Sequence, residues 1–343
     1  MHSTVRRRHL RGNMAGVVMA SWSADGTRIV TACIDGTASV WLRSPNGQWR
    51  VEARTPCADD SVRGHVAMST GGVTGAVFEP PLDAIAHIAQ SSTPLRILTS
   101  GDDGYAFVWR VHSGAASIEA TIEHRAPGAA SRARIRRAVF STRGQRIVTA
   151  GFDSTARVWA RGADSAFAQQ ICVVRHTSLV WSAEFAPGDA TTLLTASHNS
   201  VAALWRVGEA AAVGGPATET SAEEVGDAEL VGELSGHLGP VTCARFSPLY
   251  SAAVGSDPRA GLVATASYDT TVALWSAHTQ MRVATFTGHR SRVWSVEFGR
   301  SEQPFLVSAS DDGEVRCVPV PRVALRNSRR ASASLVRSPF FSA

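Results

Sequence analysis

The stretch LVATASYDTTVALW, residues 262–275, decides the fold. It reads as a short strand rich in β-branched residues, a turn at Asp269 and a second strand that ends on Trp275. The same pattern recurs as RIVTACIDGTASVW (28–41), RILTSGDDGYAFVW (96–109), RIVTAGFDSTARVW (146–159) and TLLTASHNSVAALW (192–205). A sixth copy turns at Asp312 and has Val318 where the others have tryptophan. The chain is therefore built from repeats, and each repeat contains a β-hairpin.

Each copy keeps the same spacing around its turn. A threonine or serine stands four positions before the turn residue, and the tryptophan or Val318 stands six positions after it. A further strand lies upstream, as in VTCARF (241–246) and VWSVEF (293–298), and a histidine lies upstream again. An outer strand such as MRVATF (281–286) gives each copy four strands at a period of about 40 to 45 residues, which is typical of a propeller blade.

The repeat number predicts the architecture. One four-stranded sheet cannot bury both of its faces, whereas sheets stacked around an axis bury one another and leave only short edges. We therefore predict an all-β fold, a β-propeller of six four-stranded blades over residues 1–320, with blades ending near residues 42, 110, 160, 206, 276 and 320. A seven-bladed or larger parent protein stays open as an alternative.

The repeats resemble those of the WD-repeat β-propeller family. The resemblance rests on SGH at 235–237, TGH at 287–289 and the strand-ending tryptophan of five copies. The Asp that usually follows this tryptophan in the family is missing here, which leaves the fold assignment intact. The resemblance implies that an N-terminal strand, with TVRRR (4–8) as the candidate, pairs with the last blade.

The resemblance also implies a buried hydrogen-bonded quartet in each blade, formed by His, Thr or Ser, Asp or Asn, and Trp. Such groups can satisfy one another, and the low dielectric of a core makes the network rigid. The predicted quartets are His237, Thr265, Asp269 and Trp275; His176, Thr195, Asn199 and Trp205; His9, Thr31, Asp35 and Trp41; His65, Thr99, Asp103 and Trp109; His124, Thr149, Asp153 and Trp159; and His289, Ser308 and Asp312 without a tryptophan. We interpret these repeated His, Asp and Thr residues as structural rather than as metal ligands or a catalytic triad.

A second set of positions is expected to contact ligands, because the corresponding positions of similar propellers often do. They lie just before each turn or just after the first apolar residue of the first strand, on the face where the histidine loops gather. The predicted partner-binding residues are Trp181, Trp294, Phe152, Tyr268, His198, Asp102, Asp311 and Arg136. Aromatic residues and arginine are common in interface hot spots. The alternative is that both tryptophans pack between blades.

Charge is concentrated in a few segments. Residues 208–235 contain seven acids and no arginine, which predicts an acidic flexible insertion, and residues 43–64, 79–94 and 248–260 are further insertions. Residues 321–343 hold five arginines and no acid, which predicts a basic disordered tail; its RRAS (329–332) resembles a kinase site. The cluster Arg132–Arg137 could recognise an acidic peptide, a phosphate or nucleic acid.

These features favour a non-enzymatic scaffold that binds protein or peptide partners, without cofactor, catalytic site or metal site. All basic residues are arginine, so lysine-dependent phosphate and Schiff-base chemistry is excluded. Five cysteines without a CxxC pair indicate a reduced compartment, and we expect a cytoplasmic protein, or a nuclear one if the source is eukaryotic. No apolar run is long enough to span a membrane.

Two alternative functions stay open. One is a ligand-binding or enzymatic propeller that uses the central channel, with His198, Asp102 and Asp311 as its polar groups. The other is nucleic-acid association through Arg132–Arg137 and the basic tail, although we expect protein partners rather than nucleic acid. The partners' identity, the oligomeric state and phosphorylation of the tail are not determined by the sequence.

Overall fold

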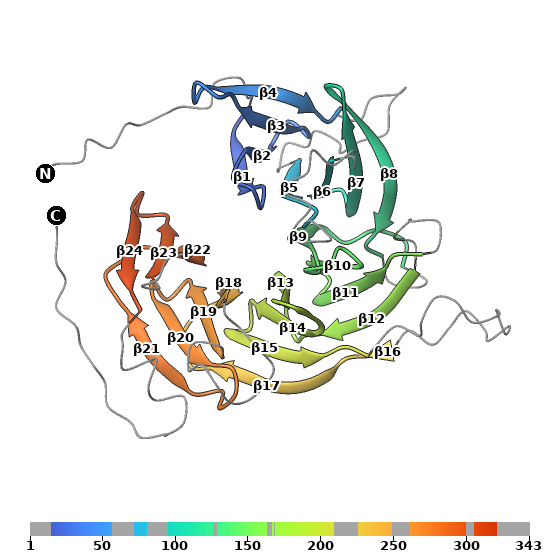
Figure 1. The fold of residues 1–343 in the computed structure, drawn as a ribbon. Helices are drawn as coiled ribbons and strands as arrows, with labels where there is room; N and C mark the ends of the chain where they lie inside the picture. Colours follow the sequence, from blue (N-terminus) through green and yellow to red (C-terminus); the bar gives the residue numbers. More distant parts are fainter. Residues whose placement is uncertain are drawn as a thin grey trace, which may run out of the picture. The chain divides into compact units, whose positions relative to one another are not determined.

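The computed structural model describes residues 15–56, 72–80, 95–125, 129–162, 167, 169–208, 226–248, 261–299 and 305–320. Within these ranges the chain forms strands, turns and irregular segments, and no helix. The strands assemble into six sheets, numbered here as blades one to six in chain order (Figure 1). The all-β fold class predicted from the sequence, with its six propeller blades, is confirmed.

Internal contacts divide the chain into two compact units. The first comprises Met1–Val139 and Arg161–Ala168, and the second comprises Phe140–Ala160 and Gln169–Ala343. The first unit holds blades one and two and most of the first strand of blade three, and the second holds the other strands.

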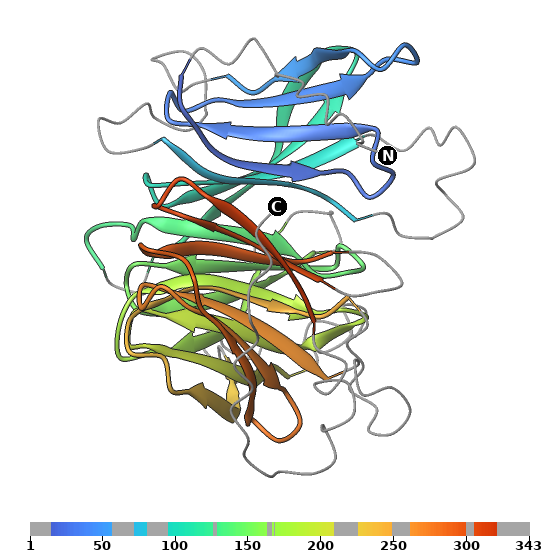
Figure 2. The same ribbon diagram turned by 90° about the vertical axis from the view of Figure 1, so that its left-hand side faces the viewer.

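Blades one and two form the body of the first unit. Their strands are β1 (Val17–Trp22), β2 (Arg28–Cys33), β3 (Ala38–Arg43) and β4 (Trp49–Arg54), then β5 (Val73–Phe78), β6 (Leu95–Gly101), β7 (Tyr105–His112) and β8 (Ala115–Glu123). Figure 2 shows the four blue strands of blade one as successive antiparallel neighbours. Val30 and Val40 of blade one share a buried cluster with Ile97 and Trp109 of blade two. Burial of apolar faces between neighbouring sheets is what stabilises each blade.

The second unit contains the rest of blade three and blades four to six. Blade three comprises β9 (Ile135–Phe140), β10 (Arg146–Gly151), β11 (Thr155–Ala160) and β12 (Gln169–Arg175). Blade four comprises β13 (Val180–Ala186), β14 (Asp189–Ser197), β15 (Val201–Arg206) and β17 (Glu229–Ser235). Blade five comprises β18 (Val241–Phe246), β19 (Leu262–Ser267), β20 (Val272–Ser276) and β21 (Arg282–Phe286), and blade six comprises β22 (Val293–Phe298), β23 (Phe305–Ser310) and β24 (Val315–Pro319).

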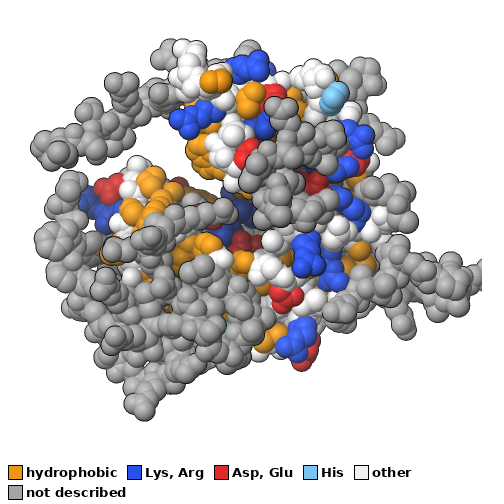
Figure 3. Space-filling view, viewed as in Figure 1, with side chains coloured by type: hydrophobic (Ala, Val, Ile, Leu, Met, Phe, Trp, Pro, Cys, Tyr) orange, Lys and Arg blue, Asp and Glu red, His pale blue; other side chains and the backbone are white. Residues whose placement is uncertain are grey.

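Neighbouring blades of the second unit bury one another in the same way. Leu194 and Leu204 of blade four pack in one cluster with Phe246 of blade five, and Leu274 of blade five packs in another with Leu306 of blade six. The first strands of blades four, five and six also contact one another in order. Hydrophobic side chains gather over blade six on the face shown in Figure 3, beside basic and acidic ones. Val315 of blade six is 70% exposed.

A β-bulge interrupts the first strand of blades four, five and six. The register between the first two strands shifts after the first residue, so that Trp181, Thr242 or Trp294 is the extra residue on its strand. A bulge bends the strand and changes the direction in which the extra side chain points. The same irregularity therefore presents the side chain at an equivalent position in three successive blades.

Two stretches that the sequence marked as insertions contain outer strands, which corrects the prediction. Residues 229–235 are not part of a flexible acidic insertion but form β17, and residues 49–54 form β4. An outer strand needs no regular apolar face, and in β17 only Leu234 is buried. The short strand β16 (Gly226–Asp227) pairs in parallel with β12. Residues 209–225 lie outside the described ranges.

The predicted blade ends mark the end of each third strand instead of the end of each sheet. β3, β7, β11, β15, β20 and β24 end at residues 43, 112, 160, 206, 276 and 319, and in blades one to five the outer strand follows and pairs with the third. Consecutive strands joined by short turns pair antiparallel, so the sheet extends beyond the repeated motif. The outer strand expected for blade six from residues 4–8, and the tail 321–343, lie outside the described ranges.

Candidate functional site

Blade five contains the complete hydrogen-bonded quartet. His237 Nδ1 lies 2.7 Å from Asp269 Oδ2, His237 Nε2 lies 2.7 Å from Thr265 Oγ1, and Trp275 Nε1 donates to the same hydroxyl at 2.8 Å. The carboxylate accepts the hydrogen bond from Nδ1, while Nε2 faces the threonine hydroxyl. Burial alone would raise the pKa of Asp269, but hydrogen bonds from His237, Thr271 and a backbone N–H hold it well below its ordinary value.

Blade six keeps three members of this arrangement. His289 Nδ1 lies 2.9 Å from Asp312 Oδ2, and His289 Nε2 lies 2.8 Å from Ser308 Oγ. Burial works against ionisation of Asp312, yet backbone N–H groups and His289 hold its pKa well below the ordinary value. Val318 replaces the tryptophan, so the serine hydroxyl has no indole donor at this position.

Blade four departs from the pattern at the turn. His176 Nε2 lies 2.8 Å from Thr195 Oγ1, and Trp205 Nε1 donates to Thr195 Oγ1 at 2.9 Å. Asn199 stands where the other blades have aspartate, and its Nδ2 donates to Thr177 Oγ1 at 3.0 Å. Without a carboxylate beside the imidazole, burial lowers the pKa of His176 to about 4.

The other three blades show the tryptophan–threonine bond. Trp41 donates to Thr31 at 3.0 Å, Trp109 to Thr99 at 2.8 Å and Trp159 to Thr149 at 3.1 Å. The turn aspartates Asp35, Asp103 and Asp153 each accept a backbone N–H two residues ahead. His9 and His65 lie outside the described ranges, and His124 is buried in the first unit, whereas its predicted partners belong to the second.

Blade three holds its turn aspartate with an arginine. The side chain of Arg157 is 2% exposed, and its Nη2 lies 3.2 Å from Asp153 Oδ2. Its Nη1 donates to Gln170 Oε1 at 2.8 Å. The motif spacing does not predict this ion pair between Arg157 and Asp153. Arg157 lies between the turn and the tryptophan, at a position where the residue varies among the six copies.

Five predicted partner-binding residues of the second unit form one cluster of rings. The aromatic cluster consists of Phe152, Trp181, His198, Tyr268 and Trp294. Ring centroids are 5.5 Å apart for Phe152 and Trp181, 5.8 Å for Trp181 and Trp294, and 5.2 Å for Tyr268 and Trp294, all edge to face. Edge-to-face pairs at such distances stabilise one another beyond the area they bury. Four rings are half-buried and His198 is exposed, so the cluster forms a surface with a fixed geometry.

The bulges and the hairpin turns bring these rings together. Trp181 and Trp294 are the bulged residues of β13 and β22, while Phe152, His198 and Tyr268 each precede a turn between second and third strands. These turns and the bulged starts of the first strands lie at the same ends of their sheets. Because of the repeat, side chains that are far apart in sequence share one end of successive blades.

Polar groups fix the two tryptophans. Trp181 Nε1 donates to His198 Nδ1 at 3.2 Å, and Trp294 Nε1 donates to Asp311 Oδ1 at 2.5 Å. Asp311 is a sixth predicted residue and is exposed. The cluster thus has its indole N–H groups bonded within the protein, and it offers ring surface and a carboxylate to a ligand.

Arg292 was not predicted from the sequence and belongs to this site. Its guanidinium carbon lies 4.8 Å from the centroid of the Tyr268 ring, and its carbonyl accepts the backbone N–H of Asp311 at 3.0 Å. A cation within about 6 Å of an aromatic face is attracted by the ring quadrupole. Its place two residues before the bulged Trp294 was the signal that could have found it.

The remaining two predicted residues, Asp102 and Arg136, belong to the first unit. Burial raises the pKa of Asp102, and the charges of Arg134 and Arg136 offset part of the increase. Arg132 of the same basic cluster lies 4.3 Å from the Tyr105 ring centroid and donates to the Asp103 carbonyl at 3.1 Å. The arginine cluster is therefore partly engaged by the surface of its own unit.

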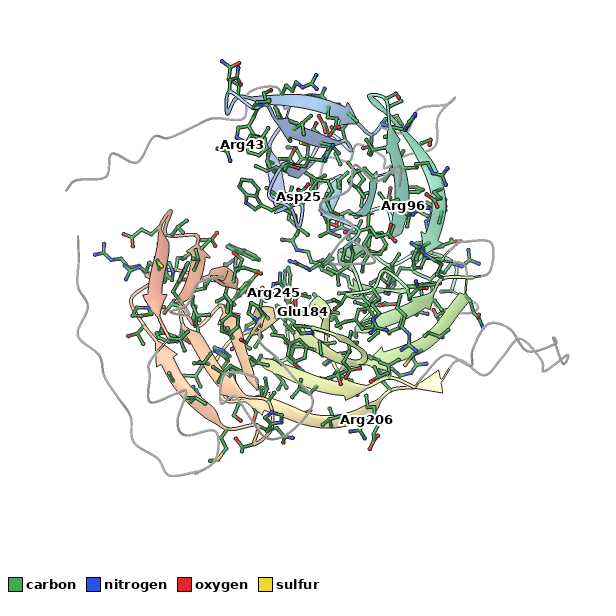
Figure 4. The ribbon with its side chains drawn as sticks, viewed as in Figure 1. Asp25, Arg43, Arg96, Glu184, Arg206 and Arg245 are labelled. Atoms are coloured by element: carbon green, nitrogen blue, oxygen red, sulfur yellow. The ribbon has the colours of Figure 1, made fainter. Side chains whose placement is uncertain are left out.

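A second feature missed from the sequence is a row of charges on the first strands of blades four to six. Arg245 Nη1 lies 3.2 Å from Glu184 Oε2, and Arg245 Nε lies 2.9 Å from Glu297 Oε2. Figure 4 labels Arg245 and Glu184, whose side chains lie next to each other. The fifth residue of VWSAEF, VTCARF and VWSVEF alternates Glu, Arg, Glu, which was the available signal. These ion pairs join neighbouring blades.

Metal sites and membrane-spanning helices are absent from the described part of the chain. No three His, Cys, Asp or Glu side chains there are placed to hold a metal ion. No helix among the described residues has the length and hydropathy needed to cross a membrane.

Comparison with known proteins agrees with the repeat structure. The family described as "WD domain, G-beta repeat" matches residues 5–41, 124–160, 228–276 and 280–318. These four ranges together cover just under half of the chain, and they show that it contains WD repeats within a fold of six blades. Blade two and the first three strands of blade four lie outside the matched ranges, but both blades have the same kind of sheet and the same tryptophan–threonine bond.

One relative is similar over a short stretch. The E3 ubiquitin-protein ligase COP1 of Arabidopsis thaliana is 37% identical over 54 residues. This match covers 16% of the present chain and 8% of the plant protein. The similarity is therefore limited to a small part of both proteins.

Proposed function

We propose that this protein is a non-enzymatic scaffold that binds partner proteins through the aromatic cluster of its second unit. The observation that carries the proposal is the cluster itself, in which four half-buried rings from blades three to six meet edge to face. Preformed aromatic surfaces bind at low entropic cost, because their side chains are already ordered. WD-repeat blades commonly serve protein interaction, which agrees with this role.

The alternatives find less support in the geometry. His198 and Asp311, the polar groups of the enzymatic hypothesis, are hydrogen-bonded to the tryptophans of the cluster. Arg132, part of the nucleic-acid hypothesis, is held by Tyr105 and Glu123. These residues have structural roles that do not require a substrate or a nucleic acid.

Substitution of Trp294 tests the proposal. We expect Trp294→Ala to reduce the recovery of specific partners in affinity purification with mass spectrometry, while Trp22→Ala, which removes an exposed tryptophan elsewhere, leaves recovery unchanged. The loss of one half-buried ring should cost about 1–2 kcal/mol, whereas Trp275→Ala in the core should cost about 3–5 kcal/mol. Unchanged partner recovery, or a stability loss equal to that of Trp275→Ala, would show that Trp294 is a packing residue.

A further inference from the structure

The aromatic cluster also indicates what kind of side chain its partner presents, an inference that rests on the proposed function. The indole N–H of Trp294 is used by Asp311, so this half-buried ring can offer a ligand the carbon surface that Trp181 and Tyr268 do not cover. Trp294 donates to Oδ1 of the exposed Asp311. The second oxygen of the Asp311 carboxylate is an acceptor at the border of the cluster. Electron-rich faces beside a carboxylate are complementary to a cation.

The protein itself contains an example of this chemistry. Arg292 stacks its guanidinium on Tyr268, at 4.8 Å from the ring centroid, although its side chain is exposed and could extend into water. A planar guanidinium can cover an aromatic face and still donate hydrogen bonds in its own plane. A guanidinium of a partner could bind Trp294 in the same way and donate to Asp311.

The charges of the neighbouring turns favour a cation as well. Asp269 and Asp312 lie in the turns beside Tyr268 and Asp311, and their pKa values are held well below the ordinary value. Both therefore remain anionic at neutral pH, and each is hydrogen-bonded to the histidine of its blade. The end of blades five and six that carries the cluster thus bears three carboxylates.

We propose that the aromatic cluster recognises an arginine side chain of a protein partner, with the guanidinium stacked on Trp294 and hydrogen-bonded to Asp311. Arginine fits better than lysine, because a planar fork can stack on a ring and donate to both carboxylate oxygens. Arg292 lies over Tyr268, the ring next to Trp294, so an arginine of the partner on Trp294 would lie beside an existing pair of cation and ring.

The test compares three small probes on the full chain. N-acetyl-arginine amide, N-acetyl-citrulline amide and N-acetyl-lysine amide are titrated while the indole N–H signals are followed by NMR. Trp181→Phe and Trp294→Phe identify the two signals of the cluster. We expect arginine to shift the Trp294 signal saturably, lysine to bind about threefold or more weakly, and citrulline, which has the same shape without the charge, to bind at least tenfold more weakly.

Two variants isolate the carboxylate. Asp311→Asn keeps an oxygen that can accept from Trp294 and removes the charge, and we expect it to weaken arginine binding about three- to tenfold without changing citrulline binding. Glu314→Gln is the matched control, because Glu314 is an exposed carboxylate of blade six that pairs with Arg316 at 2.7 Å. It should leave arginine binding unchanged.

The outcomes separate this inference from the proposed function. Equal shifts with arginine and citrulline, or arginine binding that is unchanged in Asp311→Asn, overturn arginine recognition. If arginine recognition fails while Trp294→Ala still loses its partners, the cluster binds protein through apolar contact alone. If Trp294→Ala keeps every partner, the proposed function fails as well. A thermal melt of Asp311→Asn checks that the variant is folded.

Discussion

Removal of one hydroxyl from blade five should destabilise the protein more than its removal from blade six. Thr265→Val replaces a fully buried threonine by a side chain of nearly equal shape. Two groups then lose their partner, the Trp275 indole N–H and the Nε2 of His237. Ser308→Ala in blade six takes a partner only from His289, because Val318 stands where the indole would be.

The magnitudes follow from the number of buried groups left unpaired. Each such group costs about 1–3 kcal/mol, because it gave up its hydrogen bonds to water on folding. Thr265→Val should therefore lower the free energy of unfolding by about 2–6 kcal/mol, and Ser308→Ala by about 1–3 kcal/mol. We expect a difference of about 1–3 kcal/mol between the two variants, because one more group is left unpaired in the first.

The assay is urea denaturation followed by far-UV circular dichroism and tryptophan fluorescence. Both probes are needed, because two compact units need not unfold in a single transition. The slope of each transition should not change, since the substitutions leave the buried surface nearly the same. A Thr265→Val variant no less stable than Ser308→Ala would refute the idea that the hydroxyl joins indole and imidazole in one network.

Three other experiments test a histidine, an ion pair between blades and a turn. Burial lowers the pKa of His176 to about 4, so the free energy of unfolding of the wild type should fall by up to about 3 kcal/mol as the pH falls from about 6.5 to about 4. Asn199→Asp should reduce this loss and raise the pKa of His176 as measured by NMR. Arg245→Met should lower the free energy of unfolding by about 3–5 kcal/mol, because it removes the ion-pair partner of the half-buried Glu184. In urea denaturation, the double variant with Glu184→Gln should recover part of this stability. Thr270 has φ of 72° in a turn, so Thr270→Gly should raise the melting temperature slightly; an unchanged or lower value would contradict strain there.

The candidate site was only partly visible in the sequence. Trp181, Trp294 and Tyr268 could be found because the repeat assigns equivalent positions in every blade. Arg157 could not, because it occupies a strand position at which the repeat sets no residue type, and Arg292 was marked only by its place two residues before Trp294. Their roles depend on which ring or carboxylate the neighbouring blade or strand places beside them.

Sequence periodicity determined the repeated hairpin and the number of blades, since each copy of the motif forms one sheet, and the resemblance to WD repeats predicted the bond between Thr265 and Trp275. The periodicity missed the outer strand β17, which packs only Leu234 and leaves no apolar alternation to read, whereas MRVATF did mark β21. Only the tertiary structure decided that rings of blades three to six meet and that Arg245 joins Glu184 to Glu297. Contacts between blades depend on bulges and on the stacking of sheets, and these bring together residues that no local pattern connects.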